Sequence, residues 1–256
     1  MGDDGMARIE VRDLTMAFGD FVVLRDVDFA VRRGSIFFVI GGSGSGKSTL
    51  LRHMLGLNEP ARGEVRYDGV SFTRASPAER ERMRRRFGVL YQGGALWSSM
   101  TLAENVGLPL GEFTDLSPRE IDDVVSMKLA LVGLKGFEDH FPSEISGGMM
   151  RRAGLARAMA LDPDILFLDE PSSGLDPITA ASLDALIRRL ADSLGMTFVI
   201  VTHDLASVFV ATDRVILLDK RAKGIIAEGD PRRLRDESTD PRVRAFFNRE
   251  PEAAAA

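Results

Sequence analysis

The sequence predicts an α/β fold with a mainly parallel sheet, a β-rich opening and a helical insert between roughly residues 95 and 161. Short apolar runs at residues 36–40, 165–168 and 198–201 are typical of parallel strands that are buried on both faces. Helical patterns separate the later runs, as in a chain that returns to one sheet through helices. A glycine-rich loop directly after the first run predicts a ligand site at the edge of the sheet.

Composition limits the classes of protein that fit. Hydrophobic residues make up 45% and charged residues 28% of the 256-residue chain, as in an ordinary globular protein. The formal net charge of −5 argues against general nucleic-acid binding, and the absence of cysteine excludes disulfides and thiol chemistry. The start of the sequence does not resemble a secretory signal, and the apolar runs are too short to span a bilayer. Any membrane role is therefore expected to act through a partner.

The first third of the chain predicts strands around the glycine-rich loop. Residues 8–12 alternate like a strand, and two more short strands at 21–24 and 27–31 are expected to be separated by a polar turn. Residues 64–69 predict another strand. The arginine-dense segment 80–86 is expected to be a solvated surface, with a lipid- or nucleotide-facing role as the alternative.

The glycine-rich loop, named here the phosphate loop, fits the pattern G-x-x-x-x-G-K-[ST]. Its residues are Gly41, Gly42, Ser43, Gly44, Ser45, Gly46, Lys47, Ser48 and Thr49. A polyphosphate needs several backbone N–H donors at close range, and glycines let the chain turn sharply around it. Lys47 supplies a charge for the β- and γ-phosphates, and the Ser48 hydroxyl can ligate Mg²⁺. A chance match in a flexible turn is the alternative, but a strand before the loop and a helix after it favour a phosphate site.

The middle of the chain is expected to be helical. A strand at 87–92 ends in Gln92, after which Ser117 begins a helix with a capping box and Gly133 can end it. The core face of this helix is expected to hold Ile121, Val124, Val125, Leu129 and Val132. Ser146 is expected to cap a second helix.

The last part of the chain alternates strands with helices. A strand at 165–170 ends in two acids, and Asp176 opens a helix that Gly195 closes. The core face of that helix is expected to hold Leu183, Leu186, Ile187, Leu190 and Leu194. Further strands are expected at residues 196–204, 214–219 and 224–229. Asp240 is expected to cap a last short helix.

Polar groups follow four of the predicted strands: the phosphate loop, Gln92, Asp169 with Glu170, and His203. Each group alone has an ordinary explanation. A lone glutamine is usually a surface residue, and a lone histidine usually has a structural role. Acids at the end of a strand often cap the next helix. Ligands in an open α/β sheet lie beyond the carboxyl ends of the strands. Together, the four groups therefore favour a catalytic site around one phosphate loop.

Charge predicts a role for each of these groups. Asp169 would hold Mg²⁺ directly or through water. Glu170 would polarise a water molecule for in-line attack on the γ-phosphate. His203 would contact the γ-phosphate or hold Glu170 and the water in place, and Gln92 would reach the metal or the water.

Ser146, Gly147 and Gly148 precede a helix and form a second candidate anion site. One nucleotide does not need two such sites. The second site would therefore serve a nucleotide bound to another copy, in a head-to-tail dimer around two ATP molecules. The alternative is a simple helix cap without a ligand.

The motifs resemble, in kind and order, those of the ATP-binding-cassette (ABC) ATPases over about residues 8–229. The motifs are Walker A (41–49), the Q-loop (91–92), the signature (145–149), Walker B with its catalytic glutamate (165–170), the D-loop (173–176) and the switch histidine (202–204). Phe18 falls where the family has an aromatic residue that stacks on adenine, and Asp176 ends the D-loop.

The resemblance implies a P-loop NTPase fold of the ABC cassette type, with a mainly parallel core sheet, an antiparallel β subdomain and a helical subdomain. It implies one ATPase domain over residues 1–256, in which 8–94 and 162–229 form the core and β subdomain, 95–161 the helical subdomain and 230–256 a C-terminal tail. ATP and Mg²⁺ are the implied cofactors. Two cassettes would close over two ATP molecules, each completing the other's site.

Two departures narrow the resemblance. Ile145 replaces the usual leucine of the signature motif, and Met149 replaces its glutamine. Together with the segments 91–110 and 146–171, they resemble the cassettes of Mla/Mkl-type systems for bacterial phospholipid transport. The implied assembly is a homodimer on two permease subunits at the cytoplasmic face of the inner membrane. An MCE-domain lipid-binding protein, and in some members a STAS-domain protein, are further implied partners, and no nucleic acid is expected.

Other interpretations remain open from the sequence. Residues 93–110 suit docking on a partner's helix, but Leu96, Trp97 and Leu102 would also suit the helical core. The alternatives to lipid transport are the cassette of another importer or exporter, a soluble ABC protein, and a P-loop kinase or GTPase. A single cassette without a long heptad insertion or a basic face argues against the soluble class, and the ordered motif set argues against kinases and GTPases.

Overall fold

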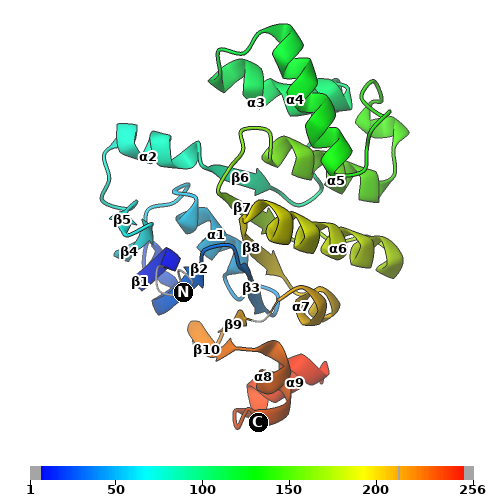
Figure 1. Ribbon diagram of the computed structural model, residues 1–256. Coiled ribbons are helices and arrows are strands. Elements are labelled where there is room, and N and C mark those ends of the chain that lie inside the picture. The colour runs from blue at the N-terminus through cyan, green and yellow to red at the C-terminus, as the bar shows by residue number, and fades with distance from the viewer. Residues whose placement is uncertain (1–6, 213, 251–256) are drawn as a thin grey trace, which may run out of the picture.

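The computed structural model describes residues 7–212 and 214–250 as two sheets with helices packed around them (Figure 1). The acidic start of the chain and the terminal alanines lie outside the described residues. The larger sheet has the strand order β10-β9-β3-β8-β7-β6, and all of its described strands except β10 run parallel. Its strands are β3 (Ile36–Gly41), β6 (Phe87–Leu90), β7 (Ile165–Asp169), β8 (Thr197–Thr202), β9 (Arg214–Asp219) and β10 (Gly224–Gly229). The predicted α/β fold with a mainly parallel sheet is confirmed.

The smaller sheet is antiparallel, in the order β2-β1-β4-β5. Its strands are β1 (Ala7–Phe18), β2 (Phe21–Arg32), β4 (Arg62–Tyr67) and β5 (Val70–Ser71). The expectation of two separate strands at 21–24 and 27–31 is wrong, because β2 runs through both. The pairing of β1 with β2 shifts register near Asp26, which has φ 50°. An irregularity in the ladder therefore accommodates the polar residues that resembled a turn.

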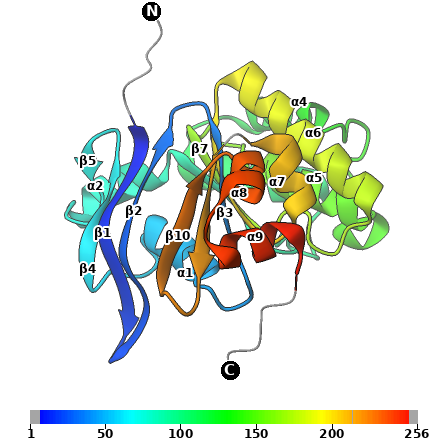
Figure 2. The same cartoon turned by 90° about the horizontal axis from the view of Figure 1, so that it is seen from below.

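The larger sheet separates two hydrophobic cores, because alternate side chains of a strand point to opposite faces. On β3, Phe38 and Ile40 face one core, and Phe37 and Val39 face the other. The second core is closed by α1 (Lys47–Met54) and the antiparallel sheet, and the first by α6 (Pro177–Leu194) and α7 (Leu205–Ala211). Figure 2 shows α1 between the two sheets and α6 and α7 on the opposite side.

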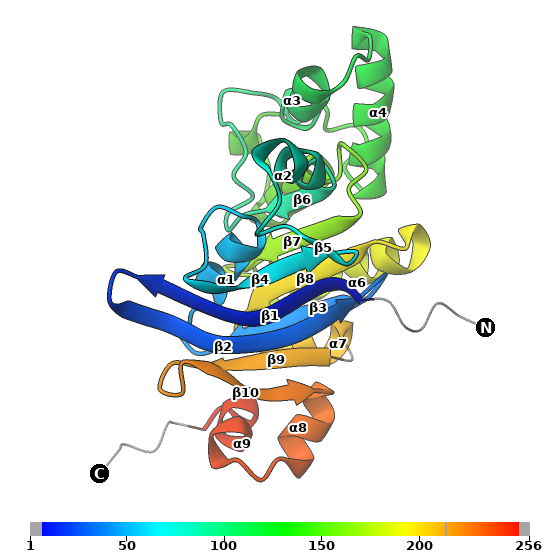
Figure 3. The same cartoon turned by 90° about the vertical axis from the view of Figure 1, so that its left-hand side faces the viewer.

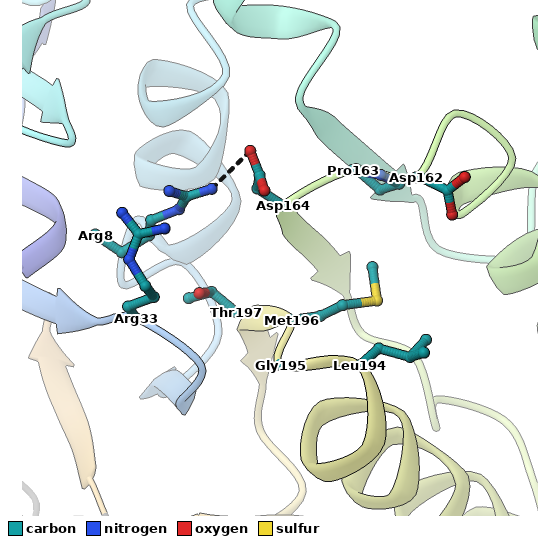
Figure 4. A pocket seen from close by; sticks show the side chains of 9 residues that line it. All are labelled: Arg8, Arg33, Asp162, Pro163, Asp164, Leu194, Gly195, Met196 and Thr197. Carbon is teal, nitrogen blue, oxygen red and sulfur yellow. Dashed lines mark ion pairs between the residues drawn. The ribbon is translucent and has the colours of Figure 1, made fainter. Parts of the chain in front are cut away.

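Helix α6 begins after its side-chain cap Asp176 and ends at Gly195 (φ 64°), as its sequence predicts. The buried members of its predicted core face are Leu183, Leu186, Ile187 and Leu190. Leu194 is 51% exposed, so its inclusion in that face is wrong. It lies in the last turn of α6 and borders an open cavity (Figure 4).

Between β6 and β7 the chain leaves the sheet and forms α3 (Leu102–Phe113), α4 (Pro118–Leu131), a short 3₁₀ helix (Pro142–Glu144) and α5 (Gly147–Ala158). Helices α3 and α4 lie far from the C-terminal helices α8 and α9 (Figure 1). Ser117 and Ser146 cap α4 and α5 as predicted. The predicted face of α4 packs inward, through the buried residues Val125, Leu129 and Val132 and the partly buried residues Ile121 and Val124.

Helix α5 meets strand β6 at two glycines. A Cβ atom on Gly88 would overlap the carbonyl oxygen of Ala158, and one on Gly154 would lie 2.7 Å from a methyl carbon of Leu90. Only glycine therefore lets the helix and the strand approach so closely. We call this contact the α5–β6 seam.

Three short helices were not predicted from the sequence: α2 (Pro77–Arg84), α7 and α8 (Pro231–Glu237). Each begins after a side-chain cap, at Ser76, Asp204 and Asp230 respectively. Helix α9 (Pro241–Asn248) begins after Asp240, as predicted. Within the described parts of the chain, no helix is both long enough and apolar enough to cross a membrane.

The arginine-dense segment 80–86 spans the end of α2, a helix that buries none of its residues. The exposed position agrees with the predicted surface role. Three of the arginines are nevertheless fixed by contacts: Arg80 pairs with Glu59, Arg84 donates to the carbonyl oxygen of Gly56, and Arg86 pairs with Asp164.

A network of ion pairs joins the two sheets near the amino ends of the parallel strands. Arg8 of β1 is 2% exposed and contacts Asp68, which follows β4, and Asp164, which precedes β7, each at 2.7 Å. Arg33 also contacts Asp68, and Arg86 contacts both acids. Figure 4 shows Arg8 and Asp164 beside a cavity of about 260 Å³ at this end of the sheet. The charges are mutually paired, so we interpret the network as a structural connection between the sheets.

Candidate nucleotide site

The order of the strands brings the four polar strand ends to one edge of the larger sheet. The phosphate loop begins at the last residue of β3, and His203 follows β8. Asp169 ends β7, Glu170 follows it, and Gln92 lies just beyond β6. These four strands are consecutive neighbours and run parallel, so their carboxyl ends point the same way.

The phosphate loop has a backbone that favours glycine. Gly41 (φ 154°), Gly44 (φ 73°) and Gly46 (φ 95°) lie in the left-handed region. A Cβ atom on Gly41 would lie 2.5 Å from the carbonyl oxygen of Leu218 in β9, and one on Gly46 would lie 3.1 Å from the side chain of Leu24 in β2. The loop therefore fits closely between β9 and β2. In the loop, Gly41, Ser45 and Lys47 are buried, Gly46 and Thr49 are partly buried, and Gly42, Ser43, Gly44 and Ser48 are exposed.

Lys47 begins α1 and directs its side chain back into the loop. Its ammonium nitrogen donates to the carbonyl oxygens of Gly41 at 2.8 Å and Gly42 at 2.9 Å. Burial lowers the pKa of Lys47, while the charges of Glu170 and Asp169 oppose that shift. The ammonium group is thus held where phosphate oxygens would replace the two carbonyl contacts.

Ser48 and Asp169 bring two oxygen ligands together at the start of α1. The Ser48 hydroxyl oxygen lies 3.3 Å from Oδ1 of Asp169. Burial raises the pKa of Asp169; the Ser48 hydrogen bond opposes the shift and the charge of Glu170 adds to it. In the part of the chain that the structure describes, no group of three or more acidic or histidine side chains could hold a metal by itself. The two oxygens of Ser48 and Asp169 fit Mg²⁺, because this ion binds few protein oxygens and takes its other ligands from water and phosphate.

Glu170 is oriented by contacts on both of its carboxylate oxygens. Oε1 lies 2.8 Å from Nδ1 of His203, and Oε2 accepts a hydrogen bond from the Thr202 hydroxyl at 3.2 Å. The backbone of Glu170 has φ 50°, which is uncommon for a residue with a side chain, and its N–H donates to the carbonyl oxygen of Val201. The Glu170 side chain is 14% exposed, against 65% for His203. The acid is thus shielded and fixed, while the imidazole is open to a ligand.

A cavity of about 510 Å³ borders Glu170 and His203. Its wall continues along residues 172–175, which follow β7, and reaches Phe246 and Arg249 at the end of α9. The two candidate catalytic side chains therefore face a space that a ligand or a second protein can enter.

Gln92 and Phe18 occupy exposed positions. Gln92 lies just beyond β6, and its side chain makes no hydrogen bond to the described residues. Phe18 is the last residue of β1 and is 55% exposed. Neither side chain is buried in a hydrophobic core, so both are accessible to a nucleotide.

Two helix starts hold the remaining candidate residues. Ser146 and Gly147 are exposed at the start of α5, and Asp176 is exposed at the start of α6. Gly148 is buried, and a Cβ atom there would overlap the side chain of Thr179, so the two helix starts pack together. No hydrogen bond within residues 7–212 and 214–250 connects them to the phosphate loop. The N–H of Met149 donates to the Ser146 hydroxyl, whereas the N–H of the exposed Gly147 donates to no described residue and is open to an anion from outside the chain.

Two residues of the site were not identified from the sequence. Thr202 contacts Glu170, and a hydroxyl at the end of a strand, next to His203, was a usable signal for it. Arg151 of α5 donates to the carbonyl oxygens of Pro171 at 3.2 Å and Ser173 at 3.0 Å, and thereby holds the segment after β7. No local pattern marks Arg151, because its contacts depend on how α5 packs.

The fold defines the class of protein, because solved ATP-binding cassettes share it over most of the chain. The structure of cbiO1 from Clostridium perfringens, part of the ABC transporter complex cbiONQ, matches with a TM-score of 0.84 and 26% identity, over 91% of this chain and 92% of that chain. An ATP-binding cassette in a dimeric post-hydrolysis state, bound to ADP and Pi, matches with a TM-score of 0.77 and 30% identity, over 87% and 98%. The predicted cassette fold is confirmed.

The chain belongs to the ABC transporter family, as an ATPase cassette, and the family match covers residues 24–173. The intermembrane phospholipid transport system ATP-binding protein MlaF of Haemophilus influenzae is 42% identical over 94% of this chain and 90% of its own length. MlaF of Escherichia coli is 41% identical over 94% and 88%. The probable ribonucleotide transport ATP-binding protein mkl of Mycobacterium tuberculosis is 43% identical over 94% of this chain, which spans 66% of that relative. The predicted resemblance to Mla/Mkl-type cassettes is confirmed.

Proposed function

We propose that this chain is the ATP-hydrolysing subunit of a bacterial transporter that moves phospholipids between membranes. The observation that carries the proposal is the identity of 42% and 41% to two MlaF proteins, over 94% of this chain in both cases. The candidate nucleotide site supplies the chemistry that such a subunit needs.

ATP binds to the backbone N–H groups of the phosphate loop at the start of α1. Lys47 exchanges its two carbonyl contacts for oxygens of the β- and γ-phosphates. Ser48 and Asp169 would hold Mg²⁺, and Gln92 would reach the metal or the water; the metal would supply positive charge against the charge that develops on the phosphate oxygens. Phe18 stacks on the adenine ring.

Glu170 acts as the base that takes a proton from the attacking water. A positioned base of this kind contributes roughly 10²–10⁴-fold to a rate. His203 and Thr202 hold the two carboxylate oxygens, so the base is oriented before the nucleotide arrives. The exposed ring of His203 also contacts the γ-phosphate.

A second copy of the chain completes each site. The start of α5, with the exposed Ser146 and Gly147 and the buried Gly148, contacts the γ-phosphate of the nucleotide on the other copy, and Asp176 lies at the same interface. The dimeric cassette with bound ADP and Pi supports this arrangement. ATP binding then favours closure of the dimer, and hydrolysis allows it to open.

The cassette dimer docks on two permease subunits at the cytoplasmic face of the inner membrane. Residues 93–110 support this role because they divide into two groups. Leu102 is buried and Leu96 partly buried in the helical core, whereas Trp97 is 59% exposed and offers an apolar surface to a permease helix. An MCE-domain lipid-binding protein, and in some systems a STAS-domain protein, complete the assembly.

We also propose how the one ATPase domain is divided. Residues 8–94 and 162–229 form the core and the β subdomain, residues 95–161 the helical subdomain and residues 230–256 the tail. Strands β6 and β7 flank the helices α3, α4 and α5, which supports the helical subdomain. Val243 and Phe247 of α9 are buried against the first core, so the described part of the tail packs on the cassette.

A transporter for a different substrate is the second candidate. It is favoured by the 43% identity to mkl, whose name refers to ribonucleotide transport. The two candidates differ in the ligand that the assembled complex holds.

Purification of the complex through a tagged copy of this subunit, in mild detergent, tests both candidates. Mass spectrometry of the bound proteins and lipids should find a permease, an MCE-domain protein and retained phospholipid. A permease that retains a nucleotide and no phospholipid would support the second candidate, and a subunit without any permease would contradict both. Trp97→Glu should reduce permease recovery, whereas Val70→Glu, at a 58% exposed residue of β5, should not.

A further inference from the structure

The turn between β9 and β10 lies beside the phosphate loop and is rich in cationic residues. It contains Lys220, Arg221 and Lys223 within four positions. Asp219 accepts a hydrogen bond from the N–H of Ala222 at 2.6 Å, and Lys223 has φ 53°, so the turn has a defined conformation. Neither lysine has a role in the hydrolysis proposed above.

Strand pairing carries this turn to the phosphate loop. Gly41, the first residue of the loop, pairs with Leu218 of β9, so the loop and the turn leave the sheet next to each other. The ammonium nitrogen of Lys220 is 3.9 Å from the position that a Cβ atom of Gly44 would occupy. Lys220 therefore reaches the tip of the loop from the side of β9.

Contacts with β2 hold the turn in this position. The N–H of Arg25 donates to the carbonyl oxygen of Lys223 at 2.8 Å, and the Lys223 ammonium lies 5.5 Å from the centre of the Phe21 ring. Figure 3 shows the β9–β10 turn at the same end of the molecule as the β1–β2 turn, where Phe18 lies. The turn thus contacts β2 through Lys223 and lies beside the tip of the phosphate loop through Lys220.

We propose that Lys220 is a second basic contact for the phosphates of the nucleotide, and that Lys223 keeps the β9–β10 turn in place. Lys220 is exposed, and its ammonium forms no ion pair with the described residues. Its flexible stem lets the charge reach an oxyanion held in the loop. This inference rests on the proposed binding of ATP.

The position of Lys220 predicts that its substitution changes the affinity for ATP and leaves the hydrolysis step unchanged. In the sheet, β9 and β7 lie on opposite sides of β3, so Lys220 approaches the loop from the side away from Glu170. Since the ammonium is exposed, its contribution is screened by salt.

Equilibrium binding of ATP, ADP and AMP to the full chain, by calorimetry at low and high salt, tests the inference. Lys220→Met should weaken ATP binding about 2- to 5-fold at low salt, the scale of one exposed charge contact. Lys220→Glu should weaken it further, and Lys220→Arg should restore it. The loss should be larger for ATP and ADP than for AMP, should shrink at high salt, and should leave the rate at saturating ATP unchanged.

The matched control is Lys135→Glu, which makes the same charge change at an exposed lysine between α4 and α5. The inference would be overturned if Lys220→Glu bound ATP as tightly as the wild type does. It would also be overturned if Lys220→Glu and Lys135→Glu lost the same amount of ATP affinity. A wild-type chain that binds no ATP would instead contradict the proposed function. Equal melting temperatures of the variants will show that the fold is unchanged.

Discussion

Nδ1 of His203 lies 2.8 Å from Oε1 of Glu170, and the two residues follow neighbouring parallel strands, β8 and β7. A carboxylate only accepts hydrogen bonds, so this contact requires a proton on Nδ1. Nε2 is then the ring nitrogen that remains for the γ-phosphate. The hydrogen bond therefore orients the proposed base and leaves Nε2 as the ring nitrogen for the proposed contact with the nucleotide.

Glu170→Gln is expected to retain ATP binding and to lower ATP turnover by about 10²–10⁴-fold, because an amide keeps the shape of the carboxylate but cannot take the proton. Steady-state release of phosphate and equilibrium binding of ATP measure the two effects. The variant should also favour the closed dimer with ATP in size-exclusion chromatography. Turnover near that of the wild type would remove Glu170 as the base.

Lys47→Ala is expected to lose most of its affinity for ATP, because the variant lacks the ammonium group that lies inside the phosphate loop. Isothermal titration with ATP measures the loss. Lys135→Ala removes an exposed lysine elsewhere and should bind ATP as the wild type does. Unchanged binding by Lys47→Ala would contradict the assignment of residues 41–49 as the phosphate loop.

Ser146→Arg and Lys47→Ala are each expected to inactivate the homodimer, for different reasons. If Ser146 serves the nucleotide of the other copy, a dimer with one subunit of each kind has one intact site and one doubly damaged site. Mixing the two proteins should therefore restore at most one competent site per dimer, as measured by nucleotide trapping. Two working sites in that mixture would refute the two-copy arrangement.

Asp184→Asn is expected to raise the free energy of unfolding near neutral pH. Asp184 of α6 is 5% exposed, and burial raises its pKa; a Ser207 hydrogen bond opposes the shift and the charge of Asp204 adds to it. A folded-state pKa above the unfolded value means that ionised Asp184 destabilises the fold at higher pH. The cost is absent below the ordinary value of about 3.9.

The gain from Asp184→Asn should therefore shrink as the pH falls from neutral toward that ordinary value. Urea unfolding of both proteins at a series of pH values measures it. A difference that does not depend on pH would show that ionisation of Asp184 is not the cause.

Gly88→Ala is expected to destabilise the protein by about 1–3 kcal/mol, because the added methyl group would overlap the backbone of α5 at the α5–β6 seam. Gly111→Ala is the matched control in α3, where no described atom lies within 4 Å of the added carbon. That change should stabilise the helix by roughly 0.5–1 kcal/mol. Chemical denaturation of the two variants gives the comparison, and equal effects would contradict the close contact at the seam.

The core of the fold was predictable because its signals are local. The apolar strands, the phosphate loop and the caps of α4, α5 and α6 each depend on a few neighbouring residues. The two-strand interpretation of residues 21–31 failed because a polar pair inside a strand, with Asp26 at φ 50°, cannot be told from a turn by composition.

The contacts that complete the site were less predictable because they form across the fold. The strand ends indicated Glu170 and His203, but their mutual contact and the Thr202 hydrogen bond depend on the pairing of β7 with β8. Likewise, Lys220 lies near the phosphate loop only because β9 pairs with β3. Such proximity has no signature in the residues around position 220.

The α5–β6 seam has a mechanical consequence for the cassette. Its two glycines place the backbone of α5 directly against β6, and Arg157 of α5 donates to the carbonyl oxygens of Gly94 and Ala95 after the strand, so the helix and the strand are expected to move as one unit. Helix α5 begins directly after its cap Ser146, and its Arg151 donates hydrogen bonds to the carbonyl oxygens of Pro171 and Ser173. A displacement of β6 would therefore carry with it the start of α5 and the segment after β7, which both belong to the proposed interface with a second copy.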